Sequence, residues 1–118
     1  MRPAPLDASY LDALFATIRD AGEHLASAQG LLAGAERTML PGWRMQLVEA
    51  ARDAHAEAGA RLAHAEERLA SLGEPDELPA PLDQLPRRLE AMRSDLRAAE
   101  QRLSRVVEAA ASRPLGQA

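Results

Sequence analysis

The chain has 118 residues, of which 47% are hydrophobic but only 3% aromatic, and its formal net charge is −4. This length is typical of one domain, and the absence of Cys excludes disulfides, thiolate nucleophiles and the common structural zinc sites. Ala and Leu supply most of the apolar side chains and favour helix, whereas the β-branched and aromatic residues typical of strands are scarce. We therefore predict an all-α protein over residues 1–118: an antiparallel helical hairpin plus a third long helix, forming a three-helix bundle or coiled coil.

The N-terminal region indicates neither export nor membrane insertion. Asp7, Asp12 and Asp20 interrupt its apolar pattern, unlike the continuous apolar core of a signal peptide. No stretch approaches the ~18 to 20 consecutive apolar residues that a membrane-spanning helix requires. We expect a cytoplasmic protein that does not bind a membrane.

The first predicted helix covers residues 8–40. Its apolar residues recur at intervals that alternate between three and four, which is the a and d pattern of a heptad with positions a to g. They are Leu11, Leu14, Ile18, Ala21, Leu25, Ala28, Leu32, Ala35 and Met39. The positions that would continue this stripe are unsuited to a core: Gly42, Gln46 and Glu49. The phase therefore resets, and the chain must reverse near this point.

The reversal is predicted at residues 41–43, the Pro-Gly-Trp sequence. Pro41 cannot donate a backbone hydrogen bond and Gly42 admits positive φ, so the pair suits a tight turn, although Pro41 can also open a helix. About a centre near Trp43, Ala positions of one arm face Ala positions of the other and large residues face large ones, which permits close antiparallel packing. Trp43, the only Trp, is predicted either to cap the open end of this seam or to contact a partner.

The second predicted helix covers residues 44–72 and repeats the alternating spacing. Its stripe is Val48, Ala51, His55, Ala58, Leu62, Ala65, Leu69 and Leu72. His55 stands at an a position, and we interpret it as a buried polar residue that specifies helix pairing or bonds to a carboxylate on the third helix. A metal ligand or a pH switch is the alternative interpretation.

A proline-rich connection, residues 73–86, precedes the third helix. It has four prolines in fourteen residues, and Gly73 suits the position after a helix end. The third helix is predicted at residues 87–112, followed by a flexible tail at 113–118. The apolar stripe of this segment, whose first two members are expected to pack beneath the helix, is Leu82, Leu85, Leu89, Met92, Leu96, Ala99, Leu103, Val106 and Ala110.

No motif in the chain indicates catalysis or a cofactor. There is no Gly-rich phosphate loop and no Ser nucleophile motif. None of the three His has a Glu three residues before it or another His four residues away, which are the spacings of helical metal sites. We therefore predict a non-enzymatic protein that binds no cofactor and no metal.

Apolar residues beside the seams predict an interaction surface. An Ala-rich hairpin alone buries too little area to offset the ordering of about 60 residues, so a third helix or a second copy must cover it. The possible interaction surface is Phe15, Leu31, Trp43, Leu47 and Val107. We predict a helical protein–protein interaction or structural adaptor protein that acts through coiled-coil packing, with itself as a homo-oligomer such as a dimer, or with another helical protein.

The basic residues support a second hypothesis. All fourteen are Arg; residues 1–80 hold 13 acidic and 7 basic residues, and residues 81–118 hold 5 acidic and 7 basic. The alternative function is therefore a small regulatory or nucleic-acid accessory protein that uses the Arg-rich third helix, with Arg93 and Arg97 as phosphate contacts. Acidic residues interleave with these Arg at i, i+3 spacing, which is more typical of a solvated face, so nucleic-acid binding is not the favoured prediction.

Two long helices joined at a turn with a lone Trp, and few other aromatic residues, resemble the Trp-x-Gly hairpin family of small proteins exported by type VII secretion. The resemblance covers residues 8–72 at most. The chain departs from the motif because Gly42 precedes Trp43 and no Gly follows Arg44. It also lacks the C-terminal Tyr-x-x-x-Asp/Glu export signal, since its only Tyr is Tyr10, and it has a third helix. The resemblance therefore implies a shared hairpin geometry.

Overall fold

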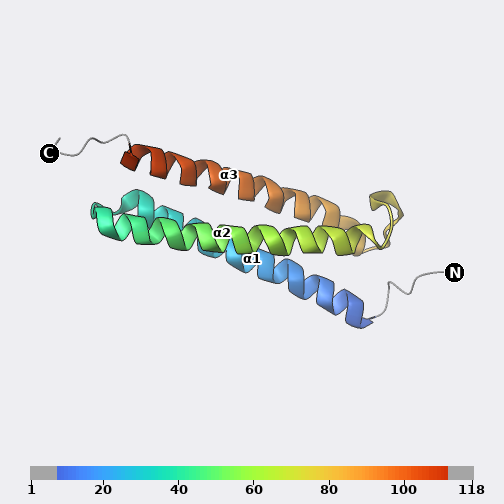
Figure 1. Ribbon diagram of the computed structural model, residues 1–118. Coiled ribbons are helices and arrows are strands. Elements are labelled where there is room, and N and C mark those ends of the chain that lie inside the picture. Colours follow the sequence, from blue (N-terminus) through green and yellow to red (C-terminus); the bar gives the residue numbers. More distant parts are fainter. Residues whose placement is uncertain (1–7, 112–118) are drawn as a thin grey trace.

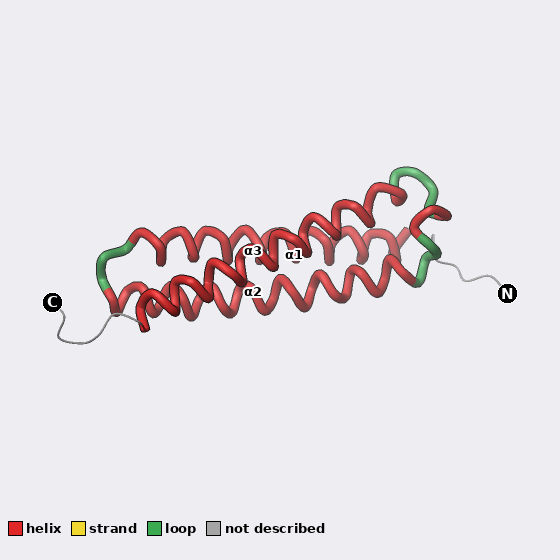
Figure 2. The backbone as a smooth tube through the Cα atoms, turned by 90° about the horizontal axis from the view of Figure 1, so that it is seen from above, coloured by secondary structure: helices red, strands yellow, loops and turns green. Residues whose placement is uncertain are grey.

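Three long helices make up most of the computed structural model, which describes residues 8–111 (Figure 1). They run side by side along one long axis, with connections at both ends (Figure 2). In chain order the elements are α1 (Ala8–Arg37), α2 (Pro41–Ala70), the short 3-10 helices η1 (Pro75–Glu77) and η2 (Leu82–Gln84), and α3 (Leu85–Ala111). No strand occurs within residues 8–111, so the predicted all-α hairpin with a third long helix is confirmed. The tail predicted at 113–118 lies outside the described residues.

α1 and α2 form an antiparallel hairpin, and their contact is the most extensive in the bundle. The a and d residues supply its core, and the Ala layers are at most 1% exposed: Ala21, Ala28, Ala35, Ala51, Ala58 and Ala65. The largest fully buried side chains lie between these layers: Leu14, Ile18, Leu32, Val48 and Leu62. Alternating small and large layers let two helices of about 45 Å pack closely along their whole length.

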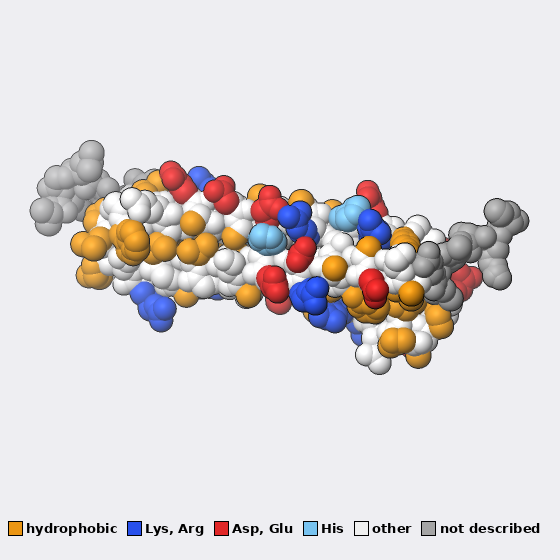
Figure 3. Space-filling model, turned by 90° about the horizontal axis from the view of Figure 1, so that it is seen from below, with side chains coloured by type: hydrophobic (Ala, Val, Ile, Leu, Met, Phe, Trp, Pro, Cys, Tyr) orange, Lys and Arg blue, Asp and Glu red, His pale blue; other side chains and the backbone are white. Residues whose placement is uncertain are grey.

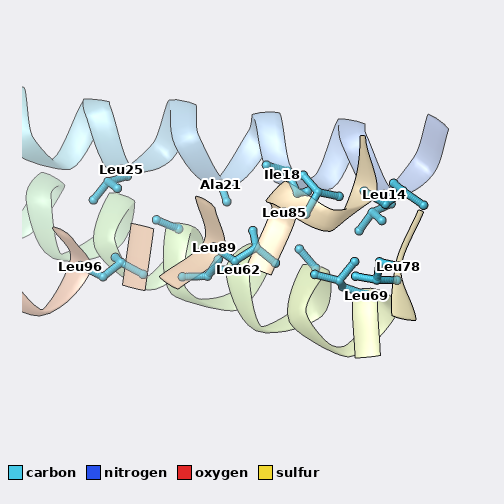
Figure 4. Close-up of a cluster of buried hydrophobic side chains, with 13 residues drawn as sticks. Leu14, Ile18, Ala21, Leu25, Leu62, Leu69, Leu78, Leu85, Leu89 and Leu96 are labelled. Atoms are coloured by element: carbon cyan, nitrogen blue, oxygen red, sulfur yellow. The ribbon is translucent and has the colours of Figure 1, made fainter. Parts of the chain in front are cut away.

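α3 closes the bundle by packing against both arms of the hairpin, more extensively against α2. The larger of two buried clusters lies toward the connection, where Leu78 and Leu82 join residues of all three helices (Figure 4). The smaller cluster lies toward the turn between α1 and α2, and its only buried residues from α3 are Ala99 and Leu103. The apolar core is therefore thinner at the turn end.

His55 links α2 to α3 in the middle of the bundle. Its Nε2–H donates to the carbonyl oxygen of Leu96 at 2.9 Å, and the imidazole is half-buried. The structure thus gives His55 a backbone acceptor rather than the carboxylate that we considered. His55 bonds to a carbonyl oxygen because its a position faces the apolar stripe of α3. On that stripe, backbone carbonyl oxygens are the available hydrogen-bond acceptors.

The turn lies at residues 38–40, so the predicted turn at 41–43 is wrong. Leu40 is extended, with φ −96° and ψ 113°, as the residue before a proline prefers. Pro41 occupies the first position of α2, where its missing N–H leaves no helical bond unmade. The Pro-Gly-Trp sequence is therefore the first turn of the second helix. The predicted centre of the hairpin near Trp43 is also wrong, because the chain reverses about residue 39, and Tyr10 accordingly bonds to Arg68 across the hairpin.

Three other helix ends differ from the prediction by two or three residues, and one of them is the end of α2, which lies at Ala70 rather than at residue 72. α1 ends at Arg37 rather than near residue 40, and Met39, which we predicted in the core, is instead 86% exposed because it has left the helix. α3 begins at Leu85, two residues earlier than predicted, because a proline is tolerated in the first turn of a helix. Leu82 and Leu85 are buried at 3% and 4% exposure, as predicted.

Candidate functional site

Large apolar side chains are exposed mainly at the end of the bundle where α1 turns into α2. Among the described residues, four of the five exposed large hydrophobic side chains belong to this end: Met39 (86%), Leu40 (65%), Trp43 (54%) and Met45 (48%). The fifth, Phe15, is 39% exposed and lies in the first half of α1. Isolated exposed apolar residues are ordinary on a protein surface, but a group of them is typical of an interaction site.

Hydrogen bonds hold the turn that carries Met39 and Leu40 and join it to the start of α2, which carries Trp43 and Met45. The Thr38 hydroxyl accepts from the Leu40 N–H at 3.3 Å, and the Arg44 guanidinium donates to the Thr38 carbonyl oxygen at 2.8 Å. The backbone N–H of Arg44 also donates to the Leu40 carbonyl oxygen at 2.8 Å. The exposed apolar side chains therefore project from a turn with a defined backbone.

The hairpin has one edge that α3 covers and one that it leaves open. At the covered edge, which the e positions form, Glu36 and Glu66 pair with arginines of α3. The g positions flank the a and d stripe on the other side, and Leu31 and Leu47 occupy them. Gly34 permits the close packing of this edge, since Leu47 Cδ1 lies 3.4 Å from the place where a Cβ would stand. We call the surface formed by the g and c positions of α1 and α2 the outer face.

Toward the turn, the outer face carries no Asp, Glu or Arg. Its g and c residues there, which we call the outer tip, are His24, Ser27, Leu31, Gly34, Thr38, Trp43, Leu47, Ala50 and Ala54. The charged residues nearest to the outer tip on this face are Asp20, Glu57 and Arg61, and the last two pair at 3.2 Å. Figure 3 views the molecule from this side: hydrophobic side chains gather at the turn end, with charged side chains along its edges, and more charged side chains and His lie in the middle.

At its other end, the outer face is closed by a polar cluster. The Tyr10 hydroxyl donates to the carbonyl oxygen of Arg68 at 2.9 Å and lies 2.6 Å from the Ser71 hydroxyl. The guanidinium carbon of Arg68 stands 5.5 Å from the centre of the Tyr10 ring, which is a cation–π contact. These contacts join the start of α1 to the end of α2, so the outer face is polar and charged at this end and uncharged at the turn.

The structure brings together three of the five residues predicted as an interaction surface. Leu31, Trp43 and Leu47 lie on the outer tip; Trp43 is exposed, whereas the two Leu are half-buried against the smaller cluster. Val107 is on α3, where it packs partly against the same cluster, and Phe15 lies at an e position toward the other end.

Met39 and Leu40 adjoin the outer tip and were missed, because the spacing of α1 placed Met39 in the core. The exposure of Met39 and Leu40 could have been predicted from Pro41. This proline moves the preceding residue out of the helical conformation, which ends the apolar stripe before Met39.

Arg93 and Arg97, the predicted phosphate contacts, line a cleft of about 430 Å³ between the end of α2 and the start of α3. Arg93 is already engaged, since its Nη2 and Nε donate to the two carboxylate oxygens of Glu66 at 2.6 and 3.4 Å. Glu74 and Glu90 line the same cleft. Its rim therefore mixes both charges, which does not favour a phosphate backbone.

A second forked ion pair fastens α3 to α1. Arg102 Nη2 and Nε donate to the carboxylate of Glu36 at 2.7 and 3.0 Å. The hydrogen bonds and positive charge of Arg102 hold the pKa of the Glu36 carboxyl below its ordinary value of 4.5, although partial burial opposes this effect. The arginines of α3 thus act partly as links to the hairpin, and Arg93 pairs across helices rather than with Glu90 on its own helix.

Within residues 8–111, no three or more side chains of His, Cys, Asp or Glu lie close enough together to hold a metal ion. None of the described helices combines the length and hydrophobicity that crossing a membrane requires. Comparisons of the chain with protein-family models, with curated proteins and with solved structures found no match. The function must therefore be argued from the site itself.

Proposed function

We propose that this chain is a non-enzymatic helical interaction protein whose outer tip binds another protein. The observation that carries the proposal is that exposed large apolar side chains and an uncharged helical face coincide at one end of the bundle. Interface cores are depleted in charged residues and enriched in aromatic residues and Met. Trp is also among the residues that most often anchor an interface, and Trp43 is the most prominent side chain of the outer tip.

The chemistry of the outer tip favours a helical partner. On the outer tip, the c positions of the two antiparallel helices carry small residues, such as Ser27, Gly34 and Ala50. An apolar helix face fits such a surface, because small residues let helix axes approach closely. The adaptor role proposed here is therefore binding through added helix packing.

The alternative, nucleic-acid binding through α3, has less support. Arg93 and Arg102 are held in forked ion pairs with carboxylates of the hairpin. A phosphate would have to displace those carboxylates before it could use the same guanidinium groups. An electrophoretic shift that persists at physiological salt and disappears in Arg93→Gln or Arg97→Gln would favour this alternative.

Hydroxyl-radical footprinting tests the proposed function. Oxidation rates of side chains are compared between dilute purified protein and the same protein in an extract of its native host. We expect Met39 and Trp43 to oxidise at least about threefold more slowly in the extract, because a bound partner excludes solvent from an interface core. Phe15 is the internal control, since it is exposed but lies away from the outer tip, and its rate should not change.

A variant makes this test specific. Trp43→Ala should abolish the protection of Met39, whereas Phe15→Ala should preserve it. Equal oxidation of Met39 and Trp43 in both samples, together with a chain that shows no self-association when its concentration is raised, would contradict the proposed function.

A further inference from the structure

The outer tip combines a large exposed side chain and small residues within one patch. Trp43 projects from α2 with 54% of its surface exposed. On α1 the patch carries the small residues Ser27 and Gly34, and the place where a Cβ of Gly34 would stand is 3.4 Å from Leu47 Cδ1. A patch that holds a large side chain and small residues can pack against its own copy, because the large side chain of each copy can lie over the small residues of the other, as a two-fold interface requires. Binding to a different protein would require only one of these features.

Charge restricts where two copies can meet. The chain has a net charge of −4, so contact between copies over much of its surface would bring like charges together. The outer tip has no Asp, Glu or Arg and lacks this repulsion. It ends at Asp20 on α1 and at Glu57 on α2, which limits the overlap of two copies to the turn end.

We propose that the outer tip binds a second copy of this chain, so that two bundles form a two-fold dimer through facing outer tips. The proposal rests on the proposed function and names its partner. Two-fold symmetry allows the hairpins to run parallel or antiparallel. The charges at the border of the outer tip decide between them.

The antiparallel arrangement is the favourable one. Tyr10 and Arg68 lie at the same height of the hairpin, and ten to eleven residues further along each helix stand Asp20 and Glu57. In a parallel dimer α1 of one copy faces α2 of the other, so Asp20 would lie opposite Glu57. In the antiparallel dimer the charged halves point away from each other, and the Trp43 ring of each copy covers Ala50 of the other.

The outer tip is large enough for a dimer of modest affinity. About 15 residues of each helix span roughly 22 Å, and two helices side by side are roughly 20 Å wide. With Trp43 and Met39 projecting from it, such a face buries about 500–700 Å² per copy, which places the whole interface near the lower limit for specific complexes. We therefore expect a dissociation constant in the micromolar range.

Sedimentation equilibrium between about 1 and 300 µM measures this association. We expect Trp43→Ala to weaken dimerisation at least about tenfold, and Ser27→Glu to do the same by placing a carboxylate on each facing patch. Both side chains are exposed, so the bundle should still fold, and circular dichroism verifies this. Phe15→Ala is the matched control at the other exposed aromatic residue and should leave the dissociation constant unchanged.

Spin labels test the orientation, because the chain has no Cys and each introduced Cys carries one label. Gln46→Cys lies near the two-fold axis of the antiparallel dimer, and its labels should be within about 25 Å of each other. Glu67→Cys lies some twenty residues along α2 from the axis, so its labels should be about 60 Å apart. A parallel dimer would instead bring the Glu67 labels as close together as the Gln46 labels.

Three results would overturn the dimer: a chain that stays monomeric at 300 µM, an association that survives both patch variants, or Glu67 labels close together. If the chain is monomeric and Met39 and Trp43 are nevertheless protected in the host extract, the outer tip binds a different protein. In that case the second-copy proposal fails while the proposed function stands. If the chain is monomeric at 300 µM and neither residue is protected in the extract, both fail.

Discussion

Replacement of His55 tests how the bond between α2 and α3 contributes to the stability of the bundle. The Nε2–H of the half-buried imidazole donates to the Leu96 carbonyl oxygen at 2.9 Å. That oxygen lies inside α3, where it also accepts the N–H of Glu100 in the helical pattern. Removal of the imidazole therefore leaves no buried polar group without a partner, and only the net value of the bond, about 1 kcal/mol, is lost.

Two substitutions separate the hydrogen bond from the packing. His55→Leu loses the bond but places an apolar side chain of similar size at a half-buried a position, which contributes about 1 kcal/mol. We therefore expect the free energy of unfolding to change by less than about 1 kcal/mol. His55→Ala loses the bond and the packing together, and we expect a loss of about 2 kcal/mol.

Urea denaturation followed by far-ultraviolet circular dichroism measures both variants at a concentration at which the chain is monomeric. Hydrogen exchange along α3 then shows whether the third helix opens locally before the bundle unfolds. A loss in His55→Leu as large as that in His55→Ala would refute the reasoning, because an apolar side chain would then fail to replace the bond.

Three further predictions concern stability. Leu62→Ala, at 0% exposure, should lower the free energy of unfolding by about 3–5 kcal/mol, whereas Leu40→Ala, at 65% exposure, should change it by less than about 0.5 kcal/mol in the same denaturation assay. Tyr10→Phe removes a hydroxyl that bonds across the hairpin, so it should cost about 1 kcal/mol and speed hydrogen exchange in the first turns of α1. Folding lowers the pKa of Glu36 through its pairing with Arg102. The contribution of this ion pair to the free energy of unfolding is therefore present above the ordinary pKa of 4.5 and is lost as the pH falls below it. At low salt, Glu36→Gln should be less stable than the natural chain by about 0.5 kcal/mol at pH 7, and this difference should shrink as the pH falls below 4.5.

Much of the core could be predicted from the sequence, because one local rule determines it. A side chain reaches the seam of a helical hairpin only if it recurs every three or four residues. The Ala and Leu positions of α1 and α2 obey this rule, and nearly all of them are buried. The rule was wrong at Met39, because it predicted that α1 continues through this residue. Pro41 instead favours an extended conformation at Leu40, so the helix ends before Met39.

The candidate site could be predicted only in part. The heptad spacing placed Leu31 and Leu47 beside the seam, but the two sides of a hairpin are equivalent until the side on which α3 returns is known. The partners of arginines in α3 depend on the same choice, so the spacing could not predict that Arg93 pairs with Glu66 of α2 rather than with Glu90. Tertiary packing, rather than local propensity, decides both features.

The two ends of the outer face are stabilised differently, and this difference favours binding at the turn. At the far end, Tyr10 and Arg68 join the helices through a hydrogen bond and a cation–π contact. At the turn, the smaller cluster holds the hairpin, and only two buried side chains of α3 contribute to it, while Trp43 remains exposed. A partner on the outer tip would therefore add buried apolar area where the intramolecular core is thinnest, and it should slow hydrogen exchange most at the end of α1 and the start of α2. Slowing that is instead uniform along α1 would indicate general stabilisation of the bundle and would argue against contact at the outer tip.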